Sequence, residues 1–367
     1  MQQLGIVGSL LNLLSSYLLF RRSQVVLLGR SRSDLKYTNC GVSQGSVLGP
    51  LLFLTYVNDI ATYIKASISL FADDTTLFYS DKCPVQLHSV LTQNLCTLHH
   101  WSELWNVTFN PQKIAVMTIS KYRNDHPPLL FNNTHISKTN THKHLGLLFH
   151  HSLSWHTHTI HLHQKVMTKI NRLRSLINLV PRHALLTIHK TNILPVFDYG
   201  NIIYDNCSDY DNRMLDKSQL SAAKIILVCL KTTSPNDVLA DLNLTSLNLR
   251  RQISLLCHVS KLILDMALCP FPDSSFRSFK EFVPYALGHN QNVQIQLFEK
   301  SLSDNFFFRE TSSLWNSLPL EIKSSSSHSI FMNRLNSHYH ISKKKCSSFV
   351  RTQSPDDFHS LYTSLRP

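Results

Sequence analysis

The sequence predicts a mixed α/β unit over the first 150 residues, followed by a part that is helical throughout. Short strand-like runs alternate with apolar helices up to residue 150, and beyond it the apolar residues recur at helical spacing. The chain has 367 residues, of which 43% are hydrophobic and 16% charged. This length and composition allow two or three packed units with a large core and argue against wholesale disorder.

The first 40 residues predict a helix that leads into a hairpin. Residues 4–20 are apolar, but Asn12, Ser15 and Ser16 interrupt them and no basic segment precedes them. The stretch is therefore too short and too polar for a transmembrane span, and it lacks the pattern of a signal peptide. Two strand-like runs, "SQVVLL" and "LKYTNC", follow around the turn-like "GRSRSD".

Residues 41–120 predict two helices and three strands. "GVSQGSVLGPLLFLTYVNDI" (41–60) predicts a glycine-rich turn that opens an apolar helix, and "SISLFADDTTLFYS" (67–80) predicts two strands with a carboxylate pair at the bend. Pro84 is typical of a helix start, and apolar residues continue at helical spacing to Trp105. "KIAVMTIS" (113–120) predicts a closing strand.

Beyond residue 150 the pattern is helical. Apolar residues from Ile160 to Val180 form one stripe, and further helices are expected over 182–194 and 214–230. After about residue 250 the sequence predicts helices separated by joints rich in proline and serine, such as "CPFPDSSF" and "KSSSSHS". The tail from Lys343 is expected to be mobile.

The distribution of charge points to a polyanionic partner. Lys and Arg number 36 against 23 Asp and Glu, a net charge of +13, and residues 121–190 alone carry ten bases, one acid and 12 of the 21 histidines. Nucleic acid is the first candidate partner and an anionic membrane the second. The eight cysteines lie far apart without a C-x-x-C pair, which indicates buried thiols in a reducing compartment rather than a disulfide framework.

Asp73 and Asp74 are the first candidates for chemistry. Two adjacent carboxylates in an apolar hairpin repel each other if they are partly buried, and a divalent cation such as Mg²⁺ removes that cost. The alternative is a solvated hairpin tip, where Asp-Asp is ordinary turn chemistry. The glycine-rich turn around Gln44 and Ser46 favours the first interpretation, because a backbone that approaches a ligand closely precedes the carboxylates within about forty residues.

In this order of elements the sequence resembles the reverse transcriptases of non-LTR (LINE-type) retrotransposons. Residues 41–60 resemble motif B, "FADD" (71–74) resembles motif C, "FNPQKIAVM" (109–117) resembles motif D, and "HLGLLF" (144–149) resembles the motif E primer grip. Later segments, "LSWHTHTIHLHQKV", "ILPVFDYGNIIYD", "LNLRRQ" and "SSLWNSLPLEI", also resemble these elements. The resemblance covers almost the whole chain.

The resemblance implies a right-hand polymerase. Residues 1–40 would be a remnant helix and hairpin, 41–150 the α/β palm, 151–245 a helical thumb, 246–342 a helical C-terminal extension and 343–367 a flexible tail. The family copies an RNA template onto a DNA primer with dNTP substrates and two Mg²⁺ ions. A nuclear location without a membrane anchor is expected from the family.

The site residues follow from the matching motifs. Asp73 and Asp74 would be the metal ligands, and Lys113 would lie near the triphosphate, although a plain surface lysine is an equal alternative. The remaining assignments are template and nucleotide positioning by Gln44, Gly45 and Ser46, the primer grip at Leu145 and Gly146, and nucleic-acid backbone contacts by Lys165, Lys169, Arg172 and Arg174.

One element of the family pattern is missing. The family carries a third carboxylate on a strand upstream of motif B, whereas residues 1–58 contain a single acid, Asp34, in a polar turn. We therefore interpret the chain as N-terminally truncated and expect little or no polymerase activity from it, since an incomplete ligand set loses transition-state stabilisation. The alternative function is a non-catalytic remnant that binds nucleic acid.

A histidine cluster offers a separate hypothesis. His156, His158, His161 and His163 crowd two helical turns, and two pairs of them can share a face. No acid or cysteine accompanies them in the sequence, which argues against a zinc site. A polar helix face that gains charge below about pH 6.5 is the favoured interpretation.

Overall fold

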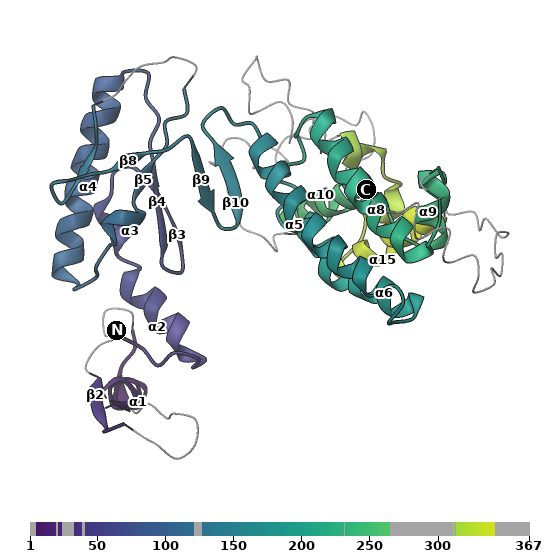
Figure 1. Ribbon diagram of the computed structural model, residues 1–367. Coiled ribbons are helices and arrows are strands. Elements are labelled where there is room, and N and C mark those ends of the chain that lie inside the picture. Colours follow the sequence, from purple (N-terminus) through teal and green to yellow (C-terminus); the bar gives the residue numbers. More distant parts are fainter. Residues whose placement is uncertain are drawn as a thin grey trace. The chain divides into compact units, whose positions relative to one another are not determined.

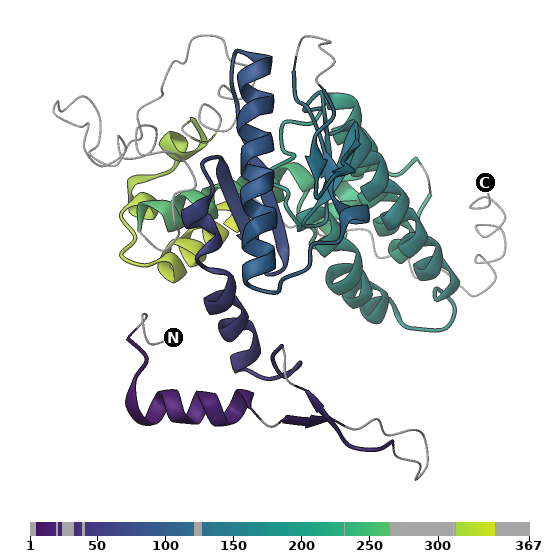
Figure 2. The same ribbon diagram turned by 90° about the vertical axis from the view of Figure 1, so that its left-hand side faces the viewer.

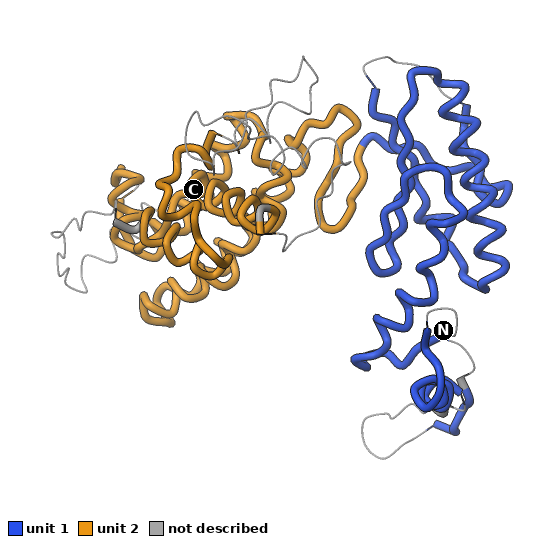
Figure 3. Tube along the Cα trace, turned by 180° about the vertical axis from the view of Figure 1, so that it is seen from behind, with its two compact units in different colours: residues 1–140 blue, residues 141–367 orange. Residues whose placement is uncertain are grey.

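The computed structural model describes residues 5–19, 21–23, 33–38, 41–120, 127–230, 232–264, 311 and 313–341. The chain divides into two compact units, residues 1–140 and 141–367 (Figure 3). The division precedes the expected end of the palm at residue 150. The reason is that residues 141–150 form a hairpin that packs against the first helix of the second unit and adds Leu147 to its core.

Unit 1 mixes helices with short two-stranded sheets (Figure 1). Its first helix is the one expected for residues 1–40. The expected hairpin is found in part: its second strand is Lys36–Thr38, but its first strand is Arg21–Ser23 instead of 23–28, and residues 24–32 lie outside the described part of the chain. The expected strand over 113–120 is reduced to two residues, β5, which pairs in parallel with β8. A 3₁₀ turn covers Pro111–Lys113. The elements are α1 (Gly8–Leu18), β1 (Arg21–Ser23), β2 (Lys36–Thr38), α2 (Leu48–Val57), α3 (Ile60–Tyr63), β3 (Ser67–Phe71), β4 (Asp74–Phe78), α4 (Pro84–Leu104), β5 (Ala115–Val116), β6 (Leu130–Phe131), β7 (Thr134–His135) and β8 (Ser137–Lys138).

The core of unit 1 lies between α4 and the β3–β4 hairpin. Ile68 and Leu70 alternate with exposed serines along β3 and turn toward Leu95 and Leu98 of α4, and Figure 2 shows α4 running along one face of the hairpin. Buried Asn94 fixes this packing, because its Oδ1 accepts hydrogen bonds from the amides of residues 65 and 66 at 2.7 and 3.3 Å. The other face of the hairpin, which carries Ser67, Ser69 and Phe71, is exposed, and we call it the open face.

Unit 2 begins with an antiparallel hairpin and continues as helices (Figure 1). The helix expected over 182–194 is confirmed, although it passes through a π-helical segment, His189–Ile193, and then continues as α7. The described elements are β9 (Thr141–His144), β10 (Leu147–His150), α5 (His156–Ser175), α6 (Arg182–Ile188), α7 (Leu194–Asp198), α8 (Asp209–Leu227), α9 (Pro235–Asp241), α10 (Leu247–Ile263), α14 (Leu320–Lys323) and α15 (His328–Ile341).

The expected apolar stripe forms the core of unit 2. Val166, Ile170 and Leu173 of α5 are buried against Leu215 and other residues of α8. The helix α8 starts five residues before the expected position 214, because Ser208 caps it by accepting a hydrogen bond from the Asp211 amide. The tail from residue 343 and the joint "CPFPDSSF" lie outside the described residues, whereas the joint "KSSSSHS" separates α14 from α15 as expected.

Candidate nucleic-acid and metal site

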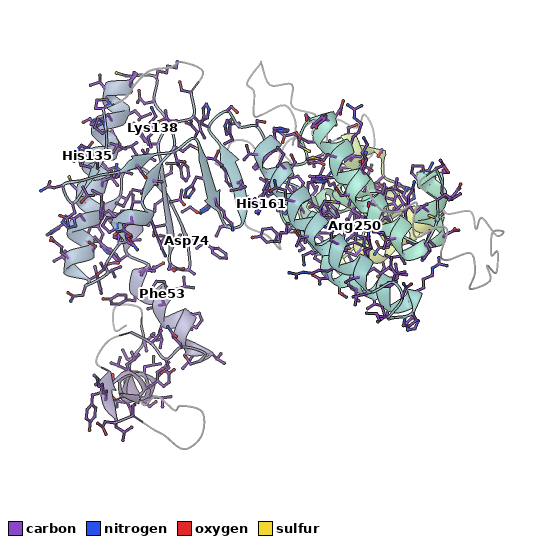
Figure 4. The ribbon with its side chains drawn as sticks, in the orientation of Figure 1. Phe53, Asp74, His135, Lys138, His161 and Arg250 are labelled. Atoms are coloured by element: carbon purple, nitrogen blue, oxygen red, sulfur yellow. The ribbon has the colours of Figure 1, made fainter. Side chains whose placement is uncertain are left out.

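The two candidate metal ligands lie at the tip of the β3–β4 hairpin. Phe71 pairs with Asp74, so Ala72 and Asp73 form a two-residue turn, in which Ala72 has a φ of 50°. Figure 4 labels Asp74 at this end of the hairpin. Asp74 and its partner Phe71, 62% exposed, share the open face. Both carboxylates are exposed, and neither forms an ion pair with a described residue.

This exposure corrects one premise drawn from the sequence. The expected repulsion between partly buried carboxylates does not arise, because water screens both groups at the tip. The hairpin tip predicted as the alternative is therefore the geometry found. It leaves carboxylate oxygens accessible from solvent, as a Mg²⁺ ion that also binds substrate phosphates requires.

The glycine-rich turn precedes α2 in the same unit. The Ser46 amide donates to the Ser43 carbonyl at 3.3 Å and closes a β-turn in which Gly45 has a φ of 81°, a conformation that favours glycine. The Ser46 hydroxyl donates to the Ser43 carbonyl at 2.7 Å and accepts from the Gly49 amide at 3.0 Å. Ser46 therefore holds the turn together, and Gln44 is left as the exposed side chain at its apex.

Lys113 ends the 3₁₀ turn of unit 1. Its side chain is exposed, and the turn is fixed by Asn110, whose Oδ1 accepts from the Gln112 amide at 3.0 Å. The motif thus presents a solvent-accessible ammonium group on a defined backbone.

In unit 2, Leu145 and Gly146 form the two-residue turn between β9 and β10. Their φ angles are 46° and 85°, and Leu147 pairs with His144 to close the hairpin. Left-handed backbone at both positions is the geometry of the tightest hairpin turns. The candidate primer grip is therefore a sharp, defined turn.

Three of the four candidate backbone-binding cations share one face of α5. At about 100° per residue, Lys169 and Arg172 lie within about 40° of Lys165 around the helix, spread over about 10 Å of its axis. Lys165 and Arg172 are exposed, and Lys169 donates to Asn192. Arg174 lies on the opposite side, half a turn from Lys165. We call Lys165, Lys169 and Arg172 the basic row.

The histidines of α5 have structural partners that the sequence did not reveal. His156 Nδ1 lies 2.7 Å from Oδ1 of Asp211, and His163 Nδ1 lies 2.8 Å from the Ser218 hydroxyl, so both face α8 as expected for a seven-residue spacing. Asp211 is 2% exposed and also accepts from Thr159 and Ser208. Burial by itself raises the pKa of Asp211, but these hydrogen bonds outweigh it and hold that pKa below its usual value. Only the capping pattern S-x-x-D at 208–211 was available as a sequence signal.

His158 overturns the interpretation of the cluster as a polar face. It is 1% exposed, its Nδ1 accepts from the Leu148 amide at 3.3 Å, and its ring contacts Trp155 and Tyr204. Burial and the nearby charge of His161 lower its pKa to about 4, so it stays neutral at pH 6.5. Within the described ranges, no three His, Cys, Asp or Glu side chains are grouped closely enough to hold a metal ion.

A cavity of about 410 Å³ in unit 2 lies among residues that the sequence did not single out. Asp198 and Arg250 form an ion pair on its wall, with Arg250 Nε 2.8 Å from Asp198 Oδ1, and Arg250 is labelled in Figure 4. None of the predicted site residues lines it.

In the described part of the chain, no helix is both long enough and apolar enough to cross a membrane.

Comparison with known proteins shows a similarity to reverse transcriptases. Residues 6–149 match the family model described as "Reverse transcriptase (RNA-dependent DNA polymerase)". The chain is 30% identical over 186 residues to the RNA-directed DNA polymerase from mobile element jockey of Drosophila melanogaster, covering 47% of this chain and 20% of that protein. It is 27% identical over 225 residues to the probable RNA-directed DNA polymerase from transposon X-element of the same organism, covering 59% and 25%.

A third relative extends the similarity. The probable RNA-directed DNA polymerase from transposon BS of Drosophila melanogaster is 27% identical over 247 residues, 63% of this chain and 27% of that protein. The chain thus spans about a fifth to a quarter of the length of these curated relatives, and no solved structure matches it. A reverse transcriptase domain has a palm-type polymerase fold, which agrees with the mixture of helix and sheet found here. Residues 6–149 are thus similar to the reverse transcriptase family, and the chain is similar to RNA-directed DNA polymerases of mobile elements.

Proposed function

We propose that the chain is a segment of an RNA-directed DNA polymerase, in which unit 1 supplies the carboxylate turn of the palm and unit 2 binds the RNA–DNA hybrid as a thumb. The observation that carries the proposal is the exposed Asp73–Asp74 turn within a segment that matches the family. The glycine turn at Gln44 and Gly45 is assigned to template and nucleotide positioning, and Lys113 to the triphosphate.

The donor set at the hairpin tip fits Mg²⁺. Asp73 and Asp74 offer hard oxygen ligands on a tight, solvent-accessible turn, and Mg²⁺ is commonly held by one or two carboxylates together with substrate phosphates. A bound Mg²⁺ supplies charge stabilisation during phosphoryl transfer. The carboxylates of Asp73 and Asp74 would hold the ion, and the left-handed backbone at Ala72 forms the turn on which they lie.

Upstream of this turn the sequence shows no carboxylate in the strand pattern that the resemblance leads us to expect. Two acids precede Asp73 in the sequence: Asp34, exposed in a short connecting segment, and Asp59, whose Oδ1 accepts a hydrogen bond from the Trp101 indole at 3.1 Å. We therefore propose that this chain by itself extends primers weakly or not at all. This favours a second candidate function, binding of an RNA–DNA hybrid without chemistry.

The basic row supports the binding function. Its three cations lie about a quarter turn around α5 from the buried stripe of that helix, so they can contact a phosphate backbone while the stripe stays in the core. Each phosphate contact releases counterions and makes affinity depend on salt. Arg174, on the far side of α5, is not part of this surface.

Two assays on the full chain test the proposal. The first is Mg²⁺-dependent primer extension on an RNA template by the parent chain and by a double variant that carries both Asp73→Asn and Asp74→Asn. Asp241→Asn, which removes an exposed acid from unit 2, is the control. Extension that only the double variant loses would assign catalysis to the turn and refute the expected inactivity. Absence of extension from a chain that binds the hybrid would support the binding function.

The second assay measures hybrid affinity against salt concentration. Lys165→Ala, Lys169→Ala and Arg172→Ala together should lower the slope of log affinity against log salt by about one unit per lost contact. Lys217→Ala, which removes an exposed cation from α8, is the control. A chain that does not bind the hybrid, or an unchanged slope, would refute the assignment.

A further inference from the structure

The hairpin turn at Leu145–Gly146 is held from outside the hairpin by Tyr199. The Tyr199 hydroxyl donates to the Leu145 carbonyl at 2.6 Å. Its ring lies over Gly146, where an added Cβ would come within 3.1 Å of the ring carbon Cε1. The contact joins residues 54 apart in the sequence, and both lie in unit 2.

The next residue, Gly200, contacts the same hairpin at Leu147. Gly200 has a φ of 66°, which favours glycine, and a Cβ there would lie 2.9 Å from a methyl group of Leu147, so a larger residue would force that side chain to shift. Leu147 is 4% exposed and belongs to the core of unit 2. The side chain of Leu147, the first strand residue after the turn, therefore packs directly against the backbone of Gly200.

A third contact ties β10 to α5. The Leu148 amide donates to Nδ1 of buried His158, and His158 lies within about 20° of Lys165 around the helix. The hairpin thus attaches to the N-terminal end of the helix face that carries the basic row. The contact of β10 with α5 therefore lies two helical turns before Lys165, on the side of the helix that carries the row.

The residue before Tyr199 is fixed by an ion pair. Tyr199 follows Asp198, the last residue of α7, whose two carboxylate oxygens both pair with Arg250 of α10. Yet the Tyr199 side chain is 57% exposed. A tyrosine that is more than half exposed adds little to the core, so its defined hydrogen bond to the turn points to a role in setting the position of that turn.

We propose that Tyr199 is a positioning residue that fixes the Leu145–Gly146 turn as a rigid contact for the end of the primer strand, in line with the basic row. The inference rests on the proposed function, since the turn has this role only if unit 2 holds a primer–template hybrid. Without the hydroxyl the turn keeps its fold, because Gly200 and His158 still hold β10, but the turn itself loses its outer support.

The test uses Tyr199→Phe in the full chain, with Tyr210→Phe as the control, an exposed tyrosine at the start of α8. Binding is measured by fluorescence anisotropy on two RNA–DNA hybrids of equal length. One has a recessed primer 3′ end, and in the other a loop closes that end. We expect Tyr199→Phe to weaken binding of the recessed hybrid about three- to tenfold, the size of one lost hydrogen bond, and to leave the closed hybrid unchanged.

A second readout is independent of nucleic acid. Amide hydrogen exchange over residues 141–150 of the free chain should be faster in Tyr199→Phe and unchanged in Tyr210→Phe. Unchanged exchange would refute the claim that the Tyr199 hydroxyl holds the Leu145–Gly146 turn. Equal weakening on both hybrids would overturn the positioning role, because it would show a general structural effect.

The outcomes separate the two levels of the proposal. A parent chain that binds both hybrids equally well keeps the binding function and overturns the contact with the primer end. A parent chain that binds neither hybrid overturns the proposed function and this inference with it.

Discussion

Acidification from pH 7.5 to 5 should destabilise unit 2 through two buried histidines. His158 and His189 are 1% and 0% exposed, and each has a pKa lowered to about 4. For His189 the causes are burial first and then the charges of Arg250 and Lys190. Both rings are therefore neutral in the folded chain at pH 5, whereas in the unfolded chain they are mostly protonated.

The sign and size of the effect follow from proton linkage. Because the folded pKa lies below the unfolded value of about 6.5, stability is complete above pH 6.5 and is lost as the pH falls from 6.5 toward 4. At pH 5 each histidine should lower the free energy of unfolding by about 2 kcal/mol, and the pair by about 4 kcal/mol. Asp205 and Asp216, whose pKa values burial raises, act in the opposite direction, so variants are compared with the parent at each pH.

The assay is urea unfolding followed by circular dichroism at pH 7.5, 6 and 5. His158→Asn keeps an acceptor near the Leu148 amide but does not titrate, and His189→Phe replaces a ring whose two nitrogens have no hydrogen-bond partner among the described residues. Each variant should lose about half of the parent's pH dependence, and the exposed His135→Asn should lose none. A parent stability that is flat between pH 7.5 and 5, or variants with the parent's full dependence, would refute the burial argument.

Three further outcomes are expected. Asp211→Ala should lower the free energy of unfolding by about 3 kcal/mol, because three hydrogen bonds to a buried carboxylate are lost; a chemical-unfolding shift below about 1 kcal/mol would contradict this. Asp211 should also stabilise the fold above about pH 4 and stop doing so as the pH falls through its lowered pKa, measured as the convergence of parent and Asp211→Ala stabilities in acid. Asn94→Leu leaves two backbone amides at the start of β3 without their acceptor and should cost about 2–3 kcal/mol, with unprotected exchange at residues 65 and 66 as the readout; protection equal to the parent's would show another acceptor.

The sequence predicted those parts of the fold in which one periodicity runs long enough to be read. The β3–β4 hairpin is marked by alternating serines and aliphatic residues, α4 by Pro84 at its start, and α5 by a stripe that recurs every three or four residues. Strands β6, β7 and β8 were not expected, since each has two residues and its pairing depends on backbone geometry rather than on a side-chain pattern.

The candidate site was predictable only in part, for a similar reason. The order of the glycine turn and the carboxylate pair is a linear pattern, and the register of the hairpin confirms that Asp73 and Asp74 share one tip. Contacts between distant segments leave no such mark. The burial of His158 depends on Tyr204 and on β10, and the partner of Tyr199 is a backbone carbonyl, which has no residue identity to read.

The β3–β4 hairpin has a consequence for handling the protein. In the described part of the chain these two strands pair only with each other, so each keeps one edge of unsatisfied amides and carbonyls, and the open face beside it carries Phe71 and Phe78, 62% and 57% exposed. Such an edge is a template for another strand. Association through these edges therefore competes with folding and increases with protein concentration. Refolding at low concentration, or with a peptide that pairs with the edge, should raise the yield of unaggregated protein.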